Sequence, residues 1–309
     1  MGNDGRKLYS AGDAADAADW HDRLEAIGEE AGYYEPIGAR HHAFFSDETP
    51  VLLVSFEQGA AIRDAGGDRM PTGYRIAAPR GWSSLSIVAE GATWFRDRAL
   101  WGYVDRLIDE GFFEDFDRVV FYGAGMGGYA AAAYAVAAPG CTVLALAPRA
   151  TLDPAVAPWD RRDLPARRLD WSARFGYAPQ MVAGAEAVFL LFDPLHAPDA
   201  AHAALFRGAH VTKLRARLIG PAPEATLARL DLLDPLVAAA CEGHLSAPHF
   251  YRLWRARRTD PAWLGRLVAR AQATAGPGRL AQACRAALDH ADHPRLRAIL
   301  AEAEAALDG

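Results

Sequence analysis

One stretch of the chain, residues 119–130, constrains the fold more than any other, and it reads VVFYGAGMGGYA. Its first part is apolar, with β-branched and aromatic residues, and it ends abruptly in glycines. An alanine-rich segment of helical composition follows as far as Ala138. A short apolar run that stops at glycines is typical of a buried strand and a sharp turn. We therefore expect a strand, a tight turn and a helix, with glycine where a positive φ or a close backbone approach excludes a side chain.

The glycine spacing also fits a dinucleotide-binding turn. Gly123, Gly125 and Gly128 match the pattern G-x-G-x-x-G. That turn needs an acidic residue about 20 residues further on to bind the ribose. Residues 143–148 read VLALAP and contain no acidic residue, and the turn lies well inside the chain. The sequence therefore disfavours a dinucleotide site, and we expect no cofactor.

The same stretch resembles the nucleophile elbow of the α/β-hydrolase family, in members that read YGxSMGGYAA. Residues 122–131 read YGAGMGGYAA, so the one difference is the catalytic serine, which is Gly125 in this chain. The likeness covers roughly the first three quarters of the sequence. It implies an α/β fold, with a mostly parallel sheet flanked by helices in residues 13–223, and a vacant nucleophile position at Gly125.

The loss of the serine has a physical interpretation. An elbow holds its nucleophile in a strained backbone conformation that costs about 1–3 kcal/mol for a residue with a side chain. Glycine adopts the same conformation without that cost. We therefore favour a non-catalytic relative of the hydrolases that acts as a ligand- or protein-binding module. The alternatives are an active serine esterase or acyltransferase with a displaced nucleophile, for which Ser83, Ser84 and Ser86 are candidates, and a binder of an anionic sugar or phosphate ligand.

The other two members of a catalytic triad are only partly represented. Asp193 closes the apolar run 187–192, where the resemblance places the triad acid, although Asp193-Pro194 also fits a simple turn. The triad histidine should follow the last strand, but residues 219–224 read IGPAPE. His196, His202 and His210 lie nearby in sequence, and ordinary surface or core positions explain them better. An active site without nucleophile and base loses most of its hydrolytic rate.

The resemblance also implies donors and cations around the turn. Met126 follows the nucleophile position and would supply one oxyanion-hole N–H, and the loop after a strand at 84–89, which contains Trp94, would supply the other. Arg96 lies in the same loop, either paired with Asp97 or in contact with a ligand. Arg149 follows the strand at 142–147, where open α/β sheets bind ligands. It is a candidate for an anionic group, with a surface salt bridge as the alternative.

The composition indicates which partners and which cellular compartment to expect. The 309 residues include 33 Lys and Arg and 39 Asp and Glu, and this formal net charge of −6 gives no indication of nucleic-acid binding. The three cysteines are too far apart for a disulfide framework or a metal site. The N-terminus lacks a signal pattern, and no apolar run approaches a membrane span. We expect a cytoplasmic protein without metal or membrane contact, whose partner is a small molecule or a protein at the elbow pocket or the C-terminal helices.

The rest of the chain divides by its periodicity. We expect disorder in residues 1–12, and a cap or lid insertion in residues 155–184, which have no clean period. Residues 224–309 are rich in Ala, Leu and Arg at helical spacing and predict an all-helical C-terminal region of three to five helices. Further expected elements are helices at 13–31 and 100–108, a hairpin of 43–45 with 51–56, and strands at 74–78, 84–89, 142–147, 187–193 and 211–219.

Overall fold

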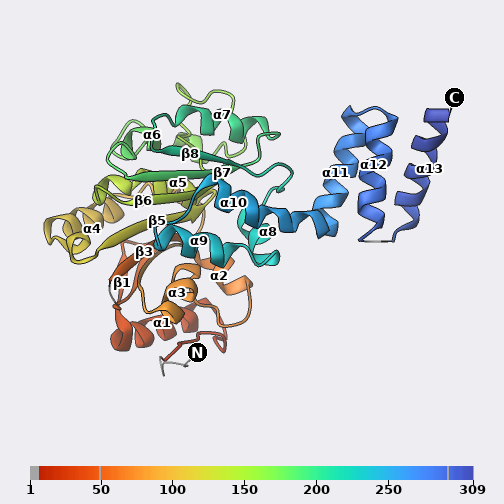
Figure 1. The fold of residues 1–309 in the computed structure, drawn as a ribbon. Coiled ribbons are helices and arrows are strands. Elements are labelled where there is room, and N and C mark those ends of the chain that lie inside the picture. Colours follow the sequence, from red (N-terminus) through yellow and green to blue (C-terminus); the bar gives the residue numbers. More distant parts are fainter. Residues whose placement is uncertain (1–6, 49, 291, 309) are drawn as a thin grey trace.

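The structure, a computed structural model, describes residues 7–48, 50–290 and 292–308. In these residues one eight-stranded sheet has the order β1-β2-β4-β3-β5-β6-β7-β8. The β1–β2 and β2–β4 pairs are antiparallel, and the remaining pairs are parallel. Helices cover both faces of the sheet (Figure 1), which confirms the expected α/β-hydrolase-like fold class. The strands are β1 (Gly32–Ile37), β2 (His41–Ser46), β3 (Val51–Gln58), β4 (Ser83–Ala89), β5 (Arg118–Ala124), β6 (Thr142–Leu146), β7 (Ala187–Phe192) and β8 (Val211–Arg215).

Two apolar cores lie on opposite faces of the sheet, because successive strand residues point to opposite sides. In β5, Val119 and Phe121 belong to one core, and Val120 and Tyr122 belong to the other. The first core includes residues of α4 (Arg98–Asp109) and α5 (Met126–Ala133). The second includes residues of α9 (Leu233–Cys241) and α10 (Ala247–Leu253). Burial on both faces explains why the central strands are continuously apolar in sequence.

The N-terminal segment corrects one expectation and confirms another. Residues 7–12 are not the disordered segment that the sequence suggested, because Ala11 is fully buried and its N–H donates to Asp68 O at 2.8 Å. Residues 1–6, the rest of that prediction, lie outside the described residues. The expected amphipathic helix is α1 (Ala17–Ala31), which buries Trp20 and Leu24.

Two predicted β elements are wrong. Segments 43–45 and 51–56 do not form a hairpin: β2 pairs with β1 and β4, whereas β3 lies between β4 and β5. Residues 74–78 are not a strand: residues 74–77 belong to the helix α3 (Thr72–Ala77), and Ala78 begins a 3₁₀ turn (Ala78–Arg80). The Glu57 carboxylate explains this helix, because it accepts hydrogen bonds from the N–H groups of Thr72 at 2.7 Å and Gly73 at 3.0 Å. These are donors that a helix leaves unpaired at its start.

The segment 155–184 has little regular structure, as its sequence suggested. It contains a short 3₁₀ turn (Ala166–Arg168) and α6 (Ala178–Met181). The other helices that adjoin the sheet are α2 (Gly59–Asp64) and α7 (Ala197–Leu205).

The C-terminal region is helical, as expected, but its described residues form six α-helices rather than three to five. The boundary expected at residue 223 runs through a shared core, since Leu227, Leu236 and Phe250 pack in the same apolar cluster as β5 and β6. The last three helices form a separate apolar cluster and project from the body of the molecule (Figure 1). The helices not yet given are α8 (Pro223–Arg229), α11 (Pro261–Thr274), α12 (Pro277–Leu288) and α13 (Pro294–Asp308).

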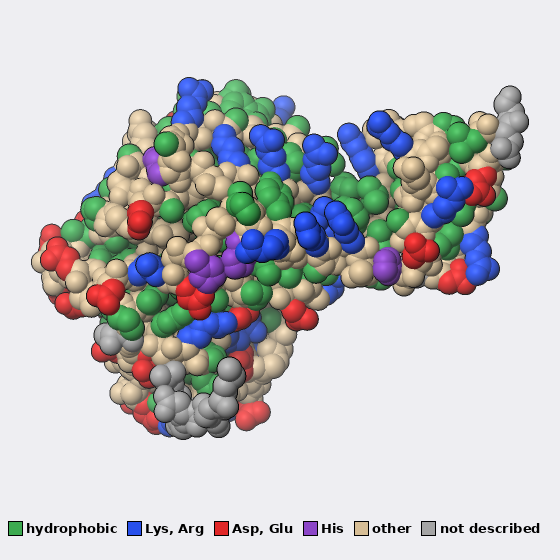
Figure 2. All heavy atoms as spheres, viewed as in Figure 1, with side chains coloured by type: hydrophobic (Ala, Val, Ile, Leu, Met, Phe, Trp, Pro, Cys, Tyr) green, Lys and Arg blue, Asp and Glu red, His purple; other side chains and the backbone are tan. Residues whose placement is uncertain are grey.

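Cys141, Cys241 and Cys284 are buried and form no disulfide. Among the described residues, no helix combines the length and the apolar character needed to cross a bilayer. Lys and Arg side chains gather over α10 and the start of α11 in Figure 2, although the net charge of the chain is negative.

The turn between β5 and α5 packs against its neighbours through glycine backbone. A Cβ on Gly127 would lie closer than 3.0 Å to the carbonyl oxygen of Phe56 at the end of β3, and one on Gly128 would lie 2.8 Å from the carbonyl oxygen of Leu146 in β6. Backbone atoms of adjacent strands cannot move aside as a flexible side chain can. These glycines therefore set how closely α5 approaches the sheet.

We expect Gly127→Ala to lower the free energy of unfolding by about 1–3 kcal/mol, because the added methyl overpacks a rigid backbone contact. Urea unfolding followed by circular dichroism measures the change. Gly102→Ala is the matched control: it lies in α4 with no atom within 4 Å of the new methyl, and we expect a gain of about 0.5–1 kcal/mol. Equal stability of Gly127→Ala and the unmodified protein would contradict this account of the turn.

Candidate functional site

Gly125 lies at the sharp turn between β5 and α5, with φ 57° and ψ −110°. A positive φ favours glycine, and no atom lies within 4 Å of the position that a Cβ would take. The first hydrogen bond of α5 runs from Tyr129 N–H to Gly125 O at 3.0 Å. The N–H groups of Met126, Gly127 and Gly128 therefore have no acceptor within the helix. The turn combines free space with the positive end of a helix.

A cavity of about 600 Å³ opens beside Gly125 at the carboxyl ends of β5, β6 and β7. It brings together three of the sequence-predicted site residues, Gly125, Arg149 and Asp193, which lie on three different strand ends. This agrees with the rule that open parallel sheets bind ligands at this edge. The other lining residues are Ala124, Ala147, Arg162, His196, Asp199 and residues 220–225.

Asp193 follows β7 and holds the surrounding loops together. Its Oδ1 accepts from Leu195 N–H and its Oδ2 accepts from Leu218 N–H, both at 2.9 Å. None of the described histidines contacts this carboxylate. His196 Nδ1 instead lies 3.0 Å from Asp199 Oδ2. Asp193 is thus placed where the resemblance puts a triad acid, but its carboxylate is not hydrogen-bonded to an imidazole of the described residues.

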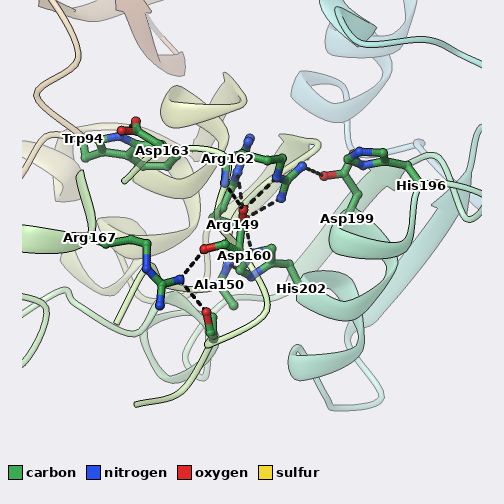
Figure 3. A network of polar contacts seen from close by, with 11 residues as sticks. Trp94, Arg149, Ala150, Asp160, Arg162, Asp163, Arg167, His196, Asp199 and His202 are labelled. Carbon is green, nitrogen blue, oxygen red and sulfur yellow. Dashed lines mark hydrogen bonds and ion pairs between the residues drawn. The ribbon is translucent and has the colours of Figure 1, made fainter. Parts of the chain in front are cut away.

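Arg149 is the cation of the cavity with the weakest pairing. Its Nε is buried and lacks a hydrogen-bond partner in the described residues, with Asp160 Oδ2 at 3.6 Å (Figure 3). Its guanidinium lies over the Trp94 ring at 5.5 Å from the ring centre. Burial, reinforced by the nearby Arg162, lowers the pKa of Arg149 from its ordinary value. The group remains positively charged at neutral pH and lacks a hydrogen-bonded carboxylate.

A buried network beside Arg149 anchors the 155–184 segment (Figure 3). Asp160 is fully buried, and it accepts from Arg162 Nη2 at 2.6 Å and from His202 Nε2 at 2.8 Å. His202 Nδ1 accepts from Ala150 N–H at 3.2 Å, so both ring nitrogens are used. Burial opposes the charge of Asp160, but the hydrogen bonds from Arg162 and His202 outweigh it and hold the pKa well below its ordinary value. His202 is therefore a core histidine that fixes this segment.

Trp94, Arg96 and Met126 do not line the cavity. Trp94 follows β4, and β3 lies between β4 and β5 in the sheet. Its N–H donates to Met126 Sδ at 3.0 Å. Arg96 is not paired with Asp97 in the described chain; it donates to the carbonyls of Arg174 and Asp170 at 2.6 Å. These residues hold the 155–184 segment against the core.

The candidate displaced nucleophiles lie inside the sheet. Ser83, Ser84 and Ser86 are fully buried in β4. Ser86 Oγ accepts from Ser55 Oγ at 3.0 Å, and Ser83 Oγ accepts from Glu48 N–H at 2.6 Å. Across the described ranges, no serine hydroxyl is hydrogen-bonded to a histidine ring.

Glu224 is a cavity residue that the sequence analysis missed. It follows β8, in the segment where the resemblance predicts the triad histidine, and it accepts a hydrogen bond from the Tyr122 hydroxyl. Burial, with a further contribution from Glu57, raises the pKa of Glu224 to about 7. Its position after the last strand could have identified it as a site residue from the sequence. Its contact with Tyr122 could not have been predicted, because the two residues are 102 positions apart in sequence.

The raised pKa of Glu224 predicts a pH-dependent stability. Between its ordinary value of 4.5 and about 7 the folded protein binds more protons than the unfolded chain, so this carboxyl lowers stability as pH rises. We expect Glu224→Gln to match the unmodified protein at pH 4.5 and to exceed its free energy of unfolding by roughly 1–3 kcal/mol at pH 8. Urea unfolding at both pH values measures this. The control is Glu110→Gln, an exposed side chain after α4, and a difference for Glu224→Gln that stays constant with pH would contradict the prediction.

Comparison with known proteins gives structural neighbours only. No family model matches the chain, and no curated protein matches it. Among solved structures, an esterase from Pyrobaculum calidifontis is 14% identical at a TM-score of 0.44, over 75% of this chain and 94% of its own. The capsule O-acetyltransferase of Neisseria meningitidis serogroup A is 9% identical at a TM-score of 0.42, over 65% of this chain and 93% of its own. An acetyl xylan esterase from Paenibacillus sp. R4 is 15% identical at a TM-score of 0.37, over 75% of this chain and 97% of its own. Identities this low carry no statement about activity.

Proposed function

We propose that this chain is a non-catalytic protein of α/β-hydrolase-like fold, whose cavity beside Gly125 binds a small anionic ligand. The observation that carries the proposal is the lining of the cavity: it contains Arg149 and Gly125, the residue before α5, but no serine, threonine, cysteine or lysine. A serine- or cysteine-type acyl intermediate needs a hydroxyl or thiol nucleophile, and the lining supplies neither. The cavity volume of about 600 Å³ is that of a small-molecule site.

The groups around the cavity support the loss of hydrolysis. The Asp193 carboxylate accepts hydrogen bonds from two backbone N–H groups, and the His196 ring is paired with the carboxylate of Asp199. An acid and a base that are not hydrogen-bonded to each other do not form a relay to the Gly125 position. The alternative, an active esterase with a displaced serine, receives no support from Ser83, Ser84 and Ser86, because all three are buried in β4.

Two features favour an anion in the cavity. The N–H groups at the start of α5 carry the positive end of the helix dipole, which attracts negative charge. Arg149 adds a full positive charge with free donors, and a charge-assisted hydrogen bond from it contributes about 1.5–3 kcal/mol. A carboxylate, phosphate or sugar acid of small size satisfies both.

We expect Arg149→Gln to weaken the binding of inorganic phosphate or acetate at least about tenfold, equivalent to about 1.4 kcal/mol, because it removes the cation and leaves the helix end. Isothermal titration calorimetry measures both affinities. Arg149→Lys keeps the charge without the planar fork and is expected to lose less.

Arg106→Gln is the matched control, since Arg106 is an exposed arginine paired with Glu35 outside the cavity. Thermal unfolding of each variant identifies a loss of fold. The proposal is overturned if the unmodified protein binds neither anion, or if folded Arg149→Gln binds both as tightly as the unmodified protein.

A further inference from the structure

The charges that line the cavity come from two sides of the sheet. Arg149 is on the side of the 155–184 segment, where it contacts Trp94, a member of the first apolar core. Glu224 is on the side of α8, where it is hydrogen-bonded to Tyr122, a member of the second core. The same cavity thus has a cation on one side and a carboxyl group on the other.

The remaining charges of the lining neutralise one another, apart from Asp193. Arg162 donates to Asp160 at 2.6 Å and to Asp199 at 2.6 Å. His196 also lies on Asp199, at 3.0 Å. Asp193 accepts only from backbone N–H groups, and no cationic side chain forms an ion pair with it in the described part of the chain. After these pairs are formed, Arg149 remains as a weakly paired cation. Asp193 and Glu224 remain as carboxyl groups without an ion-pair partner among the described residues, with only the more distant charges of Arg266 and Arg75 acting on them.

Glu224 has no cation within ion-pair distance among the described residues. The groups that face it are the Tyr122 hydroxyl from β5, the Glu57 carboxylate from β3 and Arg75 from α3. Glu57 adds negative charge and is itself fully occupied, since it accepts from the Ser55 hydroxyl and from two N–H groups of α3. Glu224 is half-buried, and a carboxylate that is largely removed from water without a counter-charge is costly. A positively charged group in the cavity would remove that cost.

We infer that the cavity selects a zwitterion, an amino acid or a related small molecule, with its anionic group at Arg149 and its ammonium group at Glu224 and Asp193. This inference rests on the proposed function and specifies its ligand. An ammonium group fits better than a hydroxyl group because it both donates hydrogen bonds and supplies the missing counter-charge. Glu224 is then the residue that determines specificity.

Binding of such a ligand would be coupled to proton release. Burial raises the pKa of Glu224 to about 7, so a large fraction of the molecules carry its proton at neutral pH. An ammonium group in contact favours the ionised carboxylate and lowers that pKa. A matched anion without the ammonium group favours the protonated, neutral form of Glu224, because a second negative charge in the cavity would repel it.

The test compares two series of probes by isothermal titration calorimetry at pH 7. The first series runs from glycine to 6-aminohexanoate, so that the separation of the two charges varies. The second contains the n-alkanoates in which a methyl group replaces the ammonium group, such as pentanoate for 4-aminobutanoate. We expect at least one amino acid to bind about tenfold or more tightly than its matched alkanoate, with proton release shown by buffers of different ionisation enthalpy. In Glu224→Gln that preference and the proton release are lost.

The outcomes separate the two proposals. If neither series binds, the proposed anion site fails, and this inference fails with it. If alkanoates bind and no amino acid binds more tightly, the anion site stands and the zwitterion inference is wrong. Retention of the preference and of proton release in Glu224→Gln also overturns the inference. The comparison within the unmodified protein needs no variant to fold.

Discussion

The close backbone packing around Gly125 is the constraint on which the rest of the site depends. Gly127 lies against the end of β3 and Gly128 against β6, so α5 begins directly above the sheet. This position fixes the direction of its N–H groups and opens the adjacent space at the carboxyl ends of β5 to β7. The positive φ of Gly125 is part of the same turn. The turn, the start of α5 and the cavity beside Gly125 therefore depend on the same backbone contacts.

The side chains that line the cavity are mostly charged. Gly125 carries no hydroxyl, and no histidine ring is hydrogen-bonded to the Asp193 carboxylate in the described residues. Arg149 is placed by β6 and by the Trp94 ring, whereas Glu224 is placed by the first turn of α8 and by Tyr122. The buried Asp160 network holds the 155–184 segment beside them. Groups fixed in this way bind a ligand with little reorganisation.

Parts of this arrangement could be predicted from the sequence because they follow from local pattern and from topology. The apolar runs at β5, β6 and β7 identify parallel strands, and parallel strands bring Gly125, Arg149 and Asp193 to one edge. Where the prediction failed, a contact distant in sequence decided the structure. The Glu57 carboxylate starts a helix at Thr72 where the side-chain pattern suggested a strand. Glu224 is held by a hydrogen bond from Tyr122, and burial with the nearby Glu57 raises its pKa. Trp94 and Arg96 were expected at the site although β3 separates their strand from β5.

The most direct test of the central claim, that the turn survives without serine-type catalysis, is labelling with a fluorophosphonate probe. The unmodified protein and a Gly125→Ser variant are treated beside an active serine hydrolase as a positive control. The account predicts that neither form is labelled. The unmodified cavity has no serine hydroxyl, and in the variant the one histidine of the lining, His196, is paired with Asp199 rather than with Asp193. Labelling of the unmodified protein would contradict the account, since it would require a reactive serine elsewhere. Labelling of the variant alone would show that the serine is the only missing part and would contradict the absence of a base.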